Sequence, residues 1–233
     1  MSHSTSNCPK PENISGTRIL DVASLEIQGL AASLKQQAPH ELVYLRSAHR
    51  ALREAIAPVY TVDERQPASV TLRKGRGSCS QRIACLEALA RAAQIATRVH
   101  ALFIKGEFWY PRFFLSRPFI PARVLLLWPQ FFLDGWVDFD ELHATTEQTV
   151  KTSSGFRNDS ESLFDAVGHS SVDFFGKSCR TTCARPEHDL SSFVLSDEGL
   201  FDTRDQALGR FGWFQDTIRG RAFELVFGGR TSA

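Results

Sequence analysis

The segment from Cys79 to about Ala93 constrains the fold of this chain more than any other. It is rich in Ala and Leu, contains no Gly or Pro, and is apolar on nearly all sides, a composition that favours a helix. Glu87 and Arg91 are spaced so that their side chains can pair on it. Helices that are apolar all round are buried. The chain must therefore surround a central helix that begins at or beside Cys79.

Three strand-like runs after this helix predict the layer that covers it. They are Thr97–Ile104, Arg123–Leu133 and Trp136–Phe139. The dipeptide Asp134-Gly135 between the last two is typical of a tight hairpin turn. We therefore expect an α+β fold in which an antiparallel meander packs on the Cys79 helix.

The rest of the chain divides by composition. Apolar spacing predicts amphipathic helices over Val22–Gln37 and Glu41–Val59, and Tyr60–Arg73 is expected to be extended or irregular. A capping-box pattern that starts at Thr203 opens a helix toward Val226. The predicted parts are a disordered tail (1–16), an N-terminal helical part (17–70), the core (71–144), a polar, loop-rich excursion (145–199), and a C-terminal helix that packs on the core (200–233).

Composition excludes several classes of protein. Of 233 residues, 42% are hydrophobic and 23% charged, and 27 Lys and Arg nearly balance 26 Asp and Glu. These values are typical of a globular protein and give no field that would attract nucleic acid or an anionic membrane. Neither a signal peptide nor a membrane helix is expected. Five cysteines, an odd number, favour reduced thiols and a cytoplasmic location. The oligomeric state is left open.

Cys79 is a candidate nucleophile because a thiol at a helix N-terminus faces the positive end of the helix dipole. Three basic residues close in sequence also favour the thiolate: Lys74, Arg76 and Arg82. The flanking Gly75 and Gly77 would let backbone N–H groups reach an oxyanion. The alternative is that Cys79 is a small buried residue at the start of a core helix. Cys85, further along the helix, is expected to be a core residue.

Four segments, in order, resemble the core of the transglutaminase-like superfamily over about residues 71–140. The first is Gly77-Ser78-Cys79-Ser80-Gln81 at the helix start, and the second is Ile95-Ala96-Thr97-Arg98-Val99. The third is Trp128 and the fourth is the run from Leu133 to Asp140. The resemblance implies a papain-like α+β fold. It also implies a Cys-His-Asp triad that transfers acyl groups, with Cys79 as the nucleophile and Asp140, or Asp138, as the acid that orients the imidazole.

The chain departs from this family at the base. The position of the family histidine falls on Leu126, and the position of the family glutamate falls on Gln130. His100, in the first strand, is the predicted substitute, although a hydrogen-bonded core imidazole is an alternative for it. A second possibility is a later histidine that folds back over the site: His143, His169 or His188. In the third possibility, no histidine acts as the base, and local basic residues hold the thiolate.

Aromatic residues and soft metal ligands suggest further sites. The run Phe108–Phe114 is densely aromatic, and we expect Trp109, together with Trp128, to contact substrate, with core packing as the alternative. Cys179 and Cys183, with His169 and His188, could form a zinc site, but their spacing is irregular and lacks the usual two-residue gap. No Walker-type phosphate loop or dinucleotide fingerprint occurs. We therefore expect no metal and no cofactor.

These features lead to one functional hypothesis and two alternatives. The hypothesis is a cysteine acyltransferase or amidase that forms a thioester on Cys79 and acts on a small-molecule or carrier-bound acyl substrate. Amide formation in specialised metabolism is one such setting, by analogy with the fold. The alternatives are a non-catalytic binding or scaffold protein of the same fold, which Leu126 favours, and a cysteine peptidase.

Overall fold

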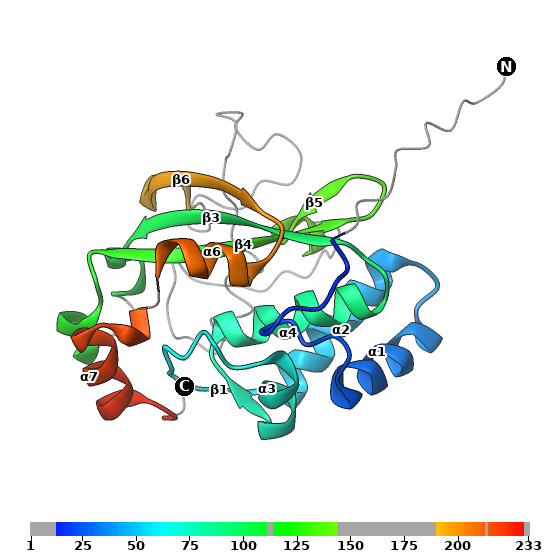
Figure 1. Ribbon diagram of the computed structural model, residues 1–233, viewed down its shortest axis with the longest axis horizontal. Helices are drawn as coiled ribbons and strands as arrows, with labels where there is room; N and C mark the ends of the chain where they lie inside the picture. Colours follow the sequence, from blue (N-terminus) through cyan, green and yellow to red (C-terminus); the bar gives the residue numbers. More distant parts are fainter. Residues whose placement is uncertain (1–12, 111–113, 144–189, 213, 231–233) are drawn as a thin grey trace, which may run out of the picture.

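The computed structural model describes residues 13–110, 114–143, 190–212 and 214–230, and of residues 114–116, 140 and 143 it describes the backbone alone. Helices form one layer and a four-stranded sheet lies across it (Figure 1). The fold is therefore α+β, as the sequence predicts. No helix among the described residues is both long enough and apolar enough to span a bilayer.

Helix α4 (Cys79–Ala92) is the centre of the molecule, and every residue from Gln81 to Arg91 is buried. Three helices pack on it: α1 (Leu25–Gln37), α2 (Glu41–Ala55) and α3 (Ala68–Lys74). A capping box fixes its start, because the Ser78 hydroxyl accepts a hydrogen bond from the Gln81 N–H (3.2 Å) and the Gln81 side chain accepts one from the Ser78 N–H (3.1 Å). The predicted buried helix beginning at Cys79 is confirmed.

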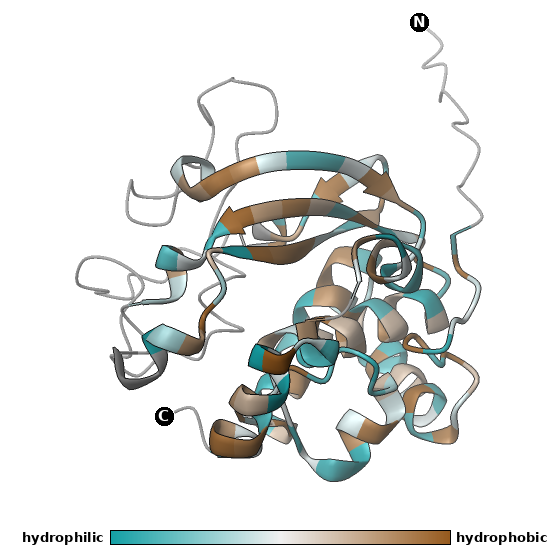
Figure 2. Ribbon diagram, turned by 60° about the vertical axis from the view of Figure 1, so that its left-hand side comes forward, coloured by the Kyte–Doolittle hydropathy of each residue, from teal (hydrophilic) through white to brown (hydrophobic). Residues whose placement is uncertain are grey.

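The sheet has the order β5-β4-β3-β6 and is antiparallel throughout. Its strands are β3 (Thr97–Lys105), β4 (Arg123–Phe132), β5 (Trp136–Asp138) and β6 (Val194–Phe201). The three predicted strands and their antiparallel pairing are confirmed. β6 is an addition, because the sequence predicts loops in that part of the chain. Figure 2 shows that much of the sheet is hydrophobic. The core lies between this sheet and the helices.

Short elements flank the sheet and complete the fold. Strands β1 (Ala57–Pro58) and β2 (Arg76–Gly77) form a parallel pair. The remaining elements of the described residues are the 3-10 helices η1 (Gly106–Trp109), η2 (Phe114–Phe119), η3 (Asp140–His143), η5 (Ser191–Phe193) and η6 (Phe214–Asp216), with helices α6 (Arg204–Phe211) and α7 (Ile218–Phe227).

Two expectations about local structure are wrong. The stretch predicted as irregular contains α3, and this helix ends at Gly75 with φ +58°, a left-handed conformation that favours glycine. The single C-terminal helix is instead the pair α6 and α7, because the chain leaves helical geometry at Gly212, where φ is +82°.

Buried arginines tie the C-terminal part of the chain to α4. Arg204, at the start of α6, donates from Nη2 to the buried Glu87 carboxylate at 2.7 Å. Arg91 donates instead to backbone carbonyls of Ser15, Thr97 and Asp202. The predicted pairing of Glu87 with Arg91 is therefore replaced by a contact between helices that lie far apart in the sequence.

Candidate functional site

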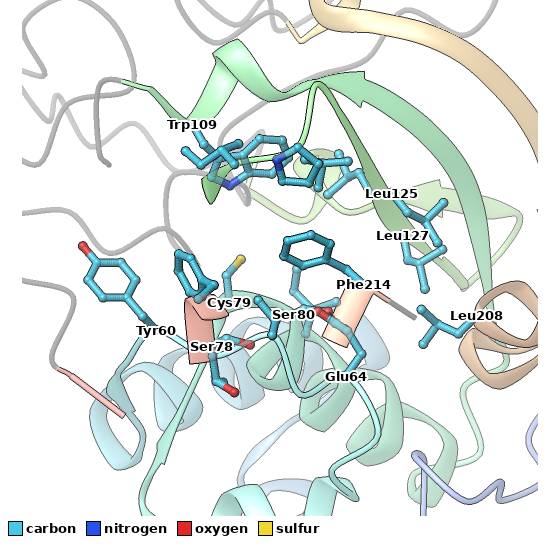
Figure 3. Close-up of a pocket in the computed structure, with 18 of the residues that line it drawn as sticks. Tyr60, Glu64, Ser78, Cys79, Ser80, Trp109, Leu125, Leu127, Leu208 and Phe214 are labelled. Atoms are coloured by element: carbon cyan, nitrogen blue, oxygen red, sulfur yellow. Dashed lines mark hydrogen bonds between the residues drawn. The ribbon is translucent and has the colours of Figure 1, made fainter. Parts of the chain in front are cut away.

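A cavity of about 500 Å³ lies at the N-terminus of α4, and the half-buried Cys79 is part of its wall. Figure 3 shows the Cys79 sulfur pointing into this cavity, with Trp109 across from it. The described residues that line it come from the loop after β1, from α4, from β3 and β4, from the segment after β3, and from the C-terminal elements. They include Tyr60, Glu64, Ser78, Cys79, Ser80, Arg82, Phe103, Trp109, Leu125, Leu126, Leu127, Leu208, Phe211, Phe214 and Phe223.

The parallel pair β1–β2 places the first wall of the cavity beside Cys79. The Ala57 N–H donates to the Gly75 carbonyl at 2.9 Å, and the Val59 N–H donates to the Gly77 carbonyl at 3.2 Å. The loop that begins at Pro58 therefore runs alongside the residues that lead into α4. Because this loop also carries Glu64, the pairing brings a carboxyl group to the helix start.

A hydrogen-bonded chain of polar side chains lies next to the thiol. The Ser80 hydroxyl donates to Glu64 Oε2 at 2.5 Å and accepts a hydrogen bond from Arg204 Nη1 at 2.9 Å. Arg204 Nη1 is itself 3.9 Å from Glu64 Oε2. Since Ser80 follows Cys79 directly, this chain links the nucleophile's neighbour to a carboxyl group and to a buried cation.

The charges of this cluster do not cancel. One guanidinium, that of Arg204, faces two carboxyl groups, those of Glu87 and Glu64. Burial raises the pKa of Glu64 above the usual glutamate value, and Arg204 offsets only part of that effect. A carboxyl group whose pKa is raised in a cavity can take up and release a proton nearer neutral pH.

Arg204 is also a cation whose charge reaches Cys79. Burial opposes the charge of this arginine, but Glu87 and Glu64, together with the Cys79 thiolate, raise its pKa above the ordinary value. The same attraction acts on the thiolate, which adds to the effect of the helix N-terminus. Cys85 differs, because burial strongly raises its pKa and its thiol donates to the Ala68 carbonyl at 3.4 Å.

The predicted site residues divide between the cavity and other places. Trp109, Arg82 and Leu126, the residue predicted to stand at the family histidine position, line the cavity with Cys79. Lys74 and Arg76 are exposed and lie outside its lining.

Neither glycine predicted for the oxyanion site lines the cavity. The Gly75 N–H donates to the Leu72 carbonyl as part of the end of α3. Gly77 is buried, and a Cβ atom there would come within 2.7 Å of Thr71 Cγ2. Close packing therefore explains this glycine, and the first N–H groups of α4, which have no acceptor within the helix, are the better oxyanion candidates.

His100 belongs to a polar cluster elsewhere on the sheet. Its Nε2 lies 2.6 Å from Asp197 Oδ1 on β6. Asp138, whose pKa is raised by burial, lies nearby. Phe103 follows His100 by three residues on β3, which pairs regularly with β4, and Phe103 lines the cavity. An odd separation puts the two side chains on opposite faces of the strand. The structure therefore does not bring His100 into the cavity with Cys79.

Trp128 is fully buried, contacts the Phe139 ring, and does not line the cavity. It is thus a core residue here, not the substrate contact that the sequence suggests. Among the described residues, no three His, Cys, Asp or Glu side chains lie together as metal ligands would. The remaining predicted residues lie outside the described residues or have undescribed side chains: Asp140, His143, His169, Cys179, Cys183 and His188.

Sequence reasoning missed Glu64, Arg204 and the aromatic wall of the C-terminal segment. Glu64 lies in a stretch predicted as irregular. Arg204 follows Cys79 by 125 positions in the sequence. The capping-box pattern at Thr203 identified the start of a helix, but no spacing rule connects that helix with α4.

Comparison with protein families gives a match to part of the chain. Residues 28–141 match the family described as the transglutaminase-like superfamily. The matched segment contains α2, α3, α4 and the strands β3 to β5. No curated protein and no solved structure matches the chain.

Proposed function

We propose that this protein, whose residues 28–141 match the transglutaminase-like superfamily, is an acyltransferase or amidase that works through a thioester on Cys79. The superfamily is one of cysteine-based acyltransferases and peptidases. The observation that carries the proposal is the position of Cys79: it begins the buried helix α4 and its sulfur points into the cavity (Figure 3). A helix N-terminus is where a thiolate is stabilised and where N–H groups can hold an oxyanion.

The proposed reaction has two steps. The Cys79 thiolate attacks the acyl carbonyl carbon, a C–S bond forms, and the bond to the leaving thiol or amine breaks as that group takes a proton. Water or an amine then attacks the thioester, loses a proton, and releases an acid or an amide while the Cys79 thiolate is restored. The first N–H groups of α4 would stabilise the negative oxygen formed in both steps.

Glu64 is the carboxyl group of the described lining that can handle these protons. Its hydrogen bond from Ser80 places it one residue from the nucleophile, and its raised pKa brings exchange of a proton closer to neutral pH. Arg204 would hold Ser80 and Glu64 in place and support the thiolate charge. Arg204 is therefore a positioning residue in this scheme.

We propose a small-molecule or carrier-bound acyl group as the substrate, with amide formation in specialised metabolism as one setting. A second candidate function is non-catalytic binding of the same group. Leu126 favours it, because an aliphatic residue lines the cavity at the position predicted for the family histidine.

Trapping the thioester tests the proposal. Wild type, Cys79→Ala and Cys85→Ala are incubated with an octanoyl thioester of N-acetylcysteamine, and intact masses are recorded. Wild type and Cys85→Ala are expected to gain one octanoyl group and Cys79→Ala none. Hydroxylamine should then release the group as the hydroxamate. Absence of acylation by this thioester and by the acetyl, butanoyl and phenylacetyl thioesters, or acylation that survives in Cys79→Ala, would overturn the thioester mechanism.

A matched octanoyl amide and a peptide amide separate the alternatives. Cleavage of the octanoyl amide, or its formation from the thioester and an added amine, supports the proposed amidase or acyltransferase. Cleavage of the peptide alone would make the protein a cysteine peptidase.

A further inference from the structure

The composition of the cavity wall identifies the class of acyl group that the site takes. Resting on the function proposed above, we infer that the cavity binds an acyl group with a bulky hydrophobic body, of the medium-chain or arylalkyl type, and holds its carbonyl at Cys79. A volume of about 500 Å³ falls within the range of roughly 300–1,000 Å³ found for small-molecule sites. An acetyl group would leave most of it unfilled.

The polar and apolar parts of the wall are separated. Most of the polar side chains come from the start of α4 and from the loop after β1: Thr61, Glu64, Ser78, Cys79, Ser80 and Arg82. Arg123 and Thr217 are polar positions elsewhere in the lining. Leu125, Leu127 and Leu208 lie together on one side of the cavity, away from Tyr60 (Figure 3). A ligand that matches this wall has a reactive polar end and an apolar body, which is the form of a hydrophobic acyl group.

Charge in the wall argues against a cationic body. Glu64 is the one acidic side chain of the described lining, and its carboxyl already accepts from Ser80. Two arginines, Arg82 and Arg123, contribute positive charge, and the Arg123 guanidinium lies 4.2 Å from the centre of the Phe103 ring. An acyl group with an amine or guanidine in its body would therefore meet repulsion as well as an apolar surface.

Part of the apolar wall comes from outside the family segment. The match ends at residue 141, whereas α6, η6 and α7 contribute four apolar side chains: Leu208, Phe211, Phe214 and Phe223. The reactive end and most of the apolar lining, including Leu125 and Leu127 on β4, belong to the matched segment, and the C-terminal elements complete the surface for the acyl body. The C-terminal segment therefore contributes to acyl-chain specificity.

Ligand binding can be measured apart from catalysis in Cys79→Ala. Octanamide, acetamide and 6-aminohexanamide are titrated into this variant, and intrinsic tryptophan fluorescence is followed, since Trp109 lines the cavity. Octanamide is expected to bind at least tenfold more tightly than either competitor. Equal affinities, or no octanamide binding, would overturn the inference whatever the catalytic result.

Acyl preference is measured on wild type with acetyl, butanoyl, octanoyl and phenylacetyl thioesters. We expect kcat/KM for octanoyl and phenylacetyl to exceed that for acetyl at least tenfold. Leu125→Trp, which fills the cavity, should move the preference toward butanoyl, and Phe214→Ala, which enlarges it, should favour chains longer than octanoyl. Leu200→Trp on β6, at a position 47% exposed and outside the lining, is the control and should change nothing.

The two sets of measurements separate the failures. Octanamide binding without acylation by any thioester would remove the proposed function and keep the binding site. Acylation at a rate independent of chain length would keep the function and overturn the hydrophobic acyl site. A preference that stays unchanged in both Leu125→Trp and Phe214→Ala would overturn the role of these walls.

Discussion

Glu64 shows how one residue acquires chemistry from its surroundings. Its carboxyl is held by the Ser80 hydroxyl and lies close to Arg204, yet burial outweighs these contacts and raises its pKa. Arg204 is shared with the fully buried Glu87, to which it donates two hydrogen bonds. Desolvation of the Glu64 carboxyl therefore outweighs the attraction of Arg204 and the hydrogen bond from Ser80.

The raised pKa of Glu64 predicts a stability difference that depends on pH. The folded state binds the Glu64 proton more tightly than the unfolded state does. The contribution of this proton to the free energy of unfolding is therefore complete below the ordinary pKa of 4.5 and is lost as pH rises through the raised pKa. Glu64→Gln cannot titrate. Its free energy of unfolding, relative to wild type, should therefore increase from pH 4 to pH 8 in urea titrations.

An exposed glutamate serves as the control for this measurement. Glu54→Gln on α2 should show no comparable trend, since Glu54 is exposed. A Glu64→Gln difference that is constant with pH, or that decreases, would show that burial does not govern this carboxyl group.

At this scale the sequence predicts Cys79 as a candidate but not its partners. A cysteine before an apolar helix is visible in the sequence, because both features are local. Glu64 and Arg204 reach Ser80 only through the β1–β2 pairing and the docking of α6 on the sheet. His100 was expected near the thiol because β3 neighbours β4, but strand alternation decides which face its ring occupies.

The start of α4 is the element on which the site depends. Ser78 and Gln81 satisfy each other's N–H groups, which fixes the first turn and the direction in which Cys79 points. Ser78→Ala should lower the free energy of unfolding by about 1 kcal/mol and should also slow alkylation of Cys79 by iodoacetamide. Thermal unfolding and timed labelling measure the two effects.

Ser24 offers a matched control at another helix start. Its hydroxyl accepts from the Ile27 N–H at 3.4 Å at the beginning of α1. Ser24→Ala should also reduce stability but leave Cys79 labelling unchanged. If both variants slow the labelling equally, general loosening of the fold, not the geometry of α4, controls the thiol.

Elements with strong local signals were predicted, and those with weak ones were not. The Ala- and Leu-rich α4 and the β-branched, aromatic strands β3 and β4 follow their propensities. β6 contains Asp197, Glu198 and Gly199, which are poor strand formers, and it lies at an edge of the sheet. α3 is short and includes the β-branched Val70 and Thr71. Tertiary contacts therefore determine both.

Across the whole molecule, the C-terminal helix holds the loop that carries Tyr60 and Glu64. The Glu224 carboxylate of α7 accepts from the Val62 N–H at 2.9 Å and from the Thr61 hydroxyl at 3.0 Å. The Glu64 N–H donates to the Gln215 side chain at 3.0 Å. The polar wall of the cavity is therefore fixed from outside the matched family segment.

Glu224→Ala should release this loop. Loss of a charged acceptor for two donors is expected to cost about 1.5–3 kcal/mol and to reduce acyl transfer. Hydrogen exchange should report faster exchange over residues 59–65. Leu225→Ala, next on the same helix and 88% exposed, is the control. Unchanged exchange in Glu224→Ala would show that other contacts hold the loop.

Selective alkylation of Cys79 tests the central claim, that this thiol is a poised nucleophile. The native protein is treated briefly with iodoacetamide at neutral pH, and modified peptides are mapped by mass spectrometry in wild type, Cys79→Ala and Cys85→Ala. We predict that Cys79 is modified first, far faster than an ordinary thiol, whose pKa is about 8.5. Cys85, which is fully buried and whose pKa is raised, should react only on unfolding. If Cys79 stays unmodified in the native protein while other thiols react, Cys79 is not the nucleophile.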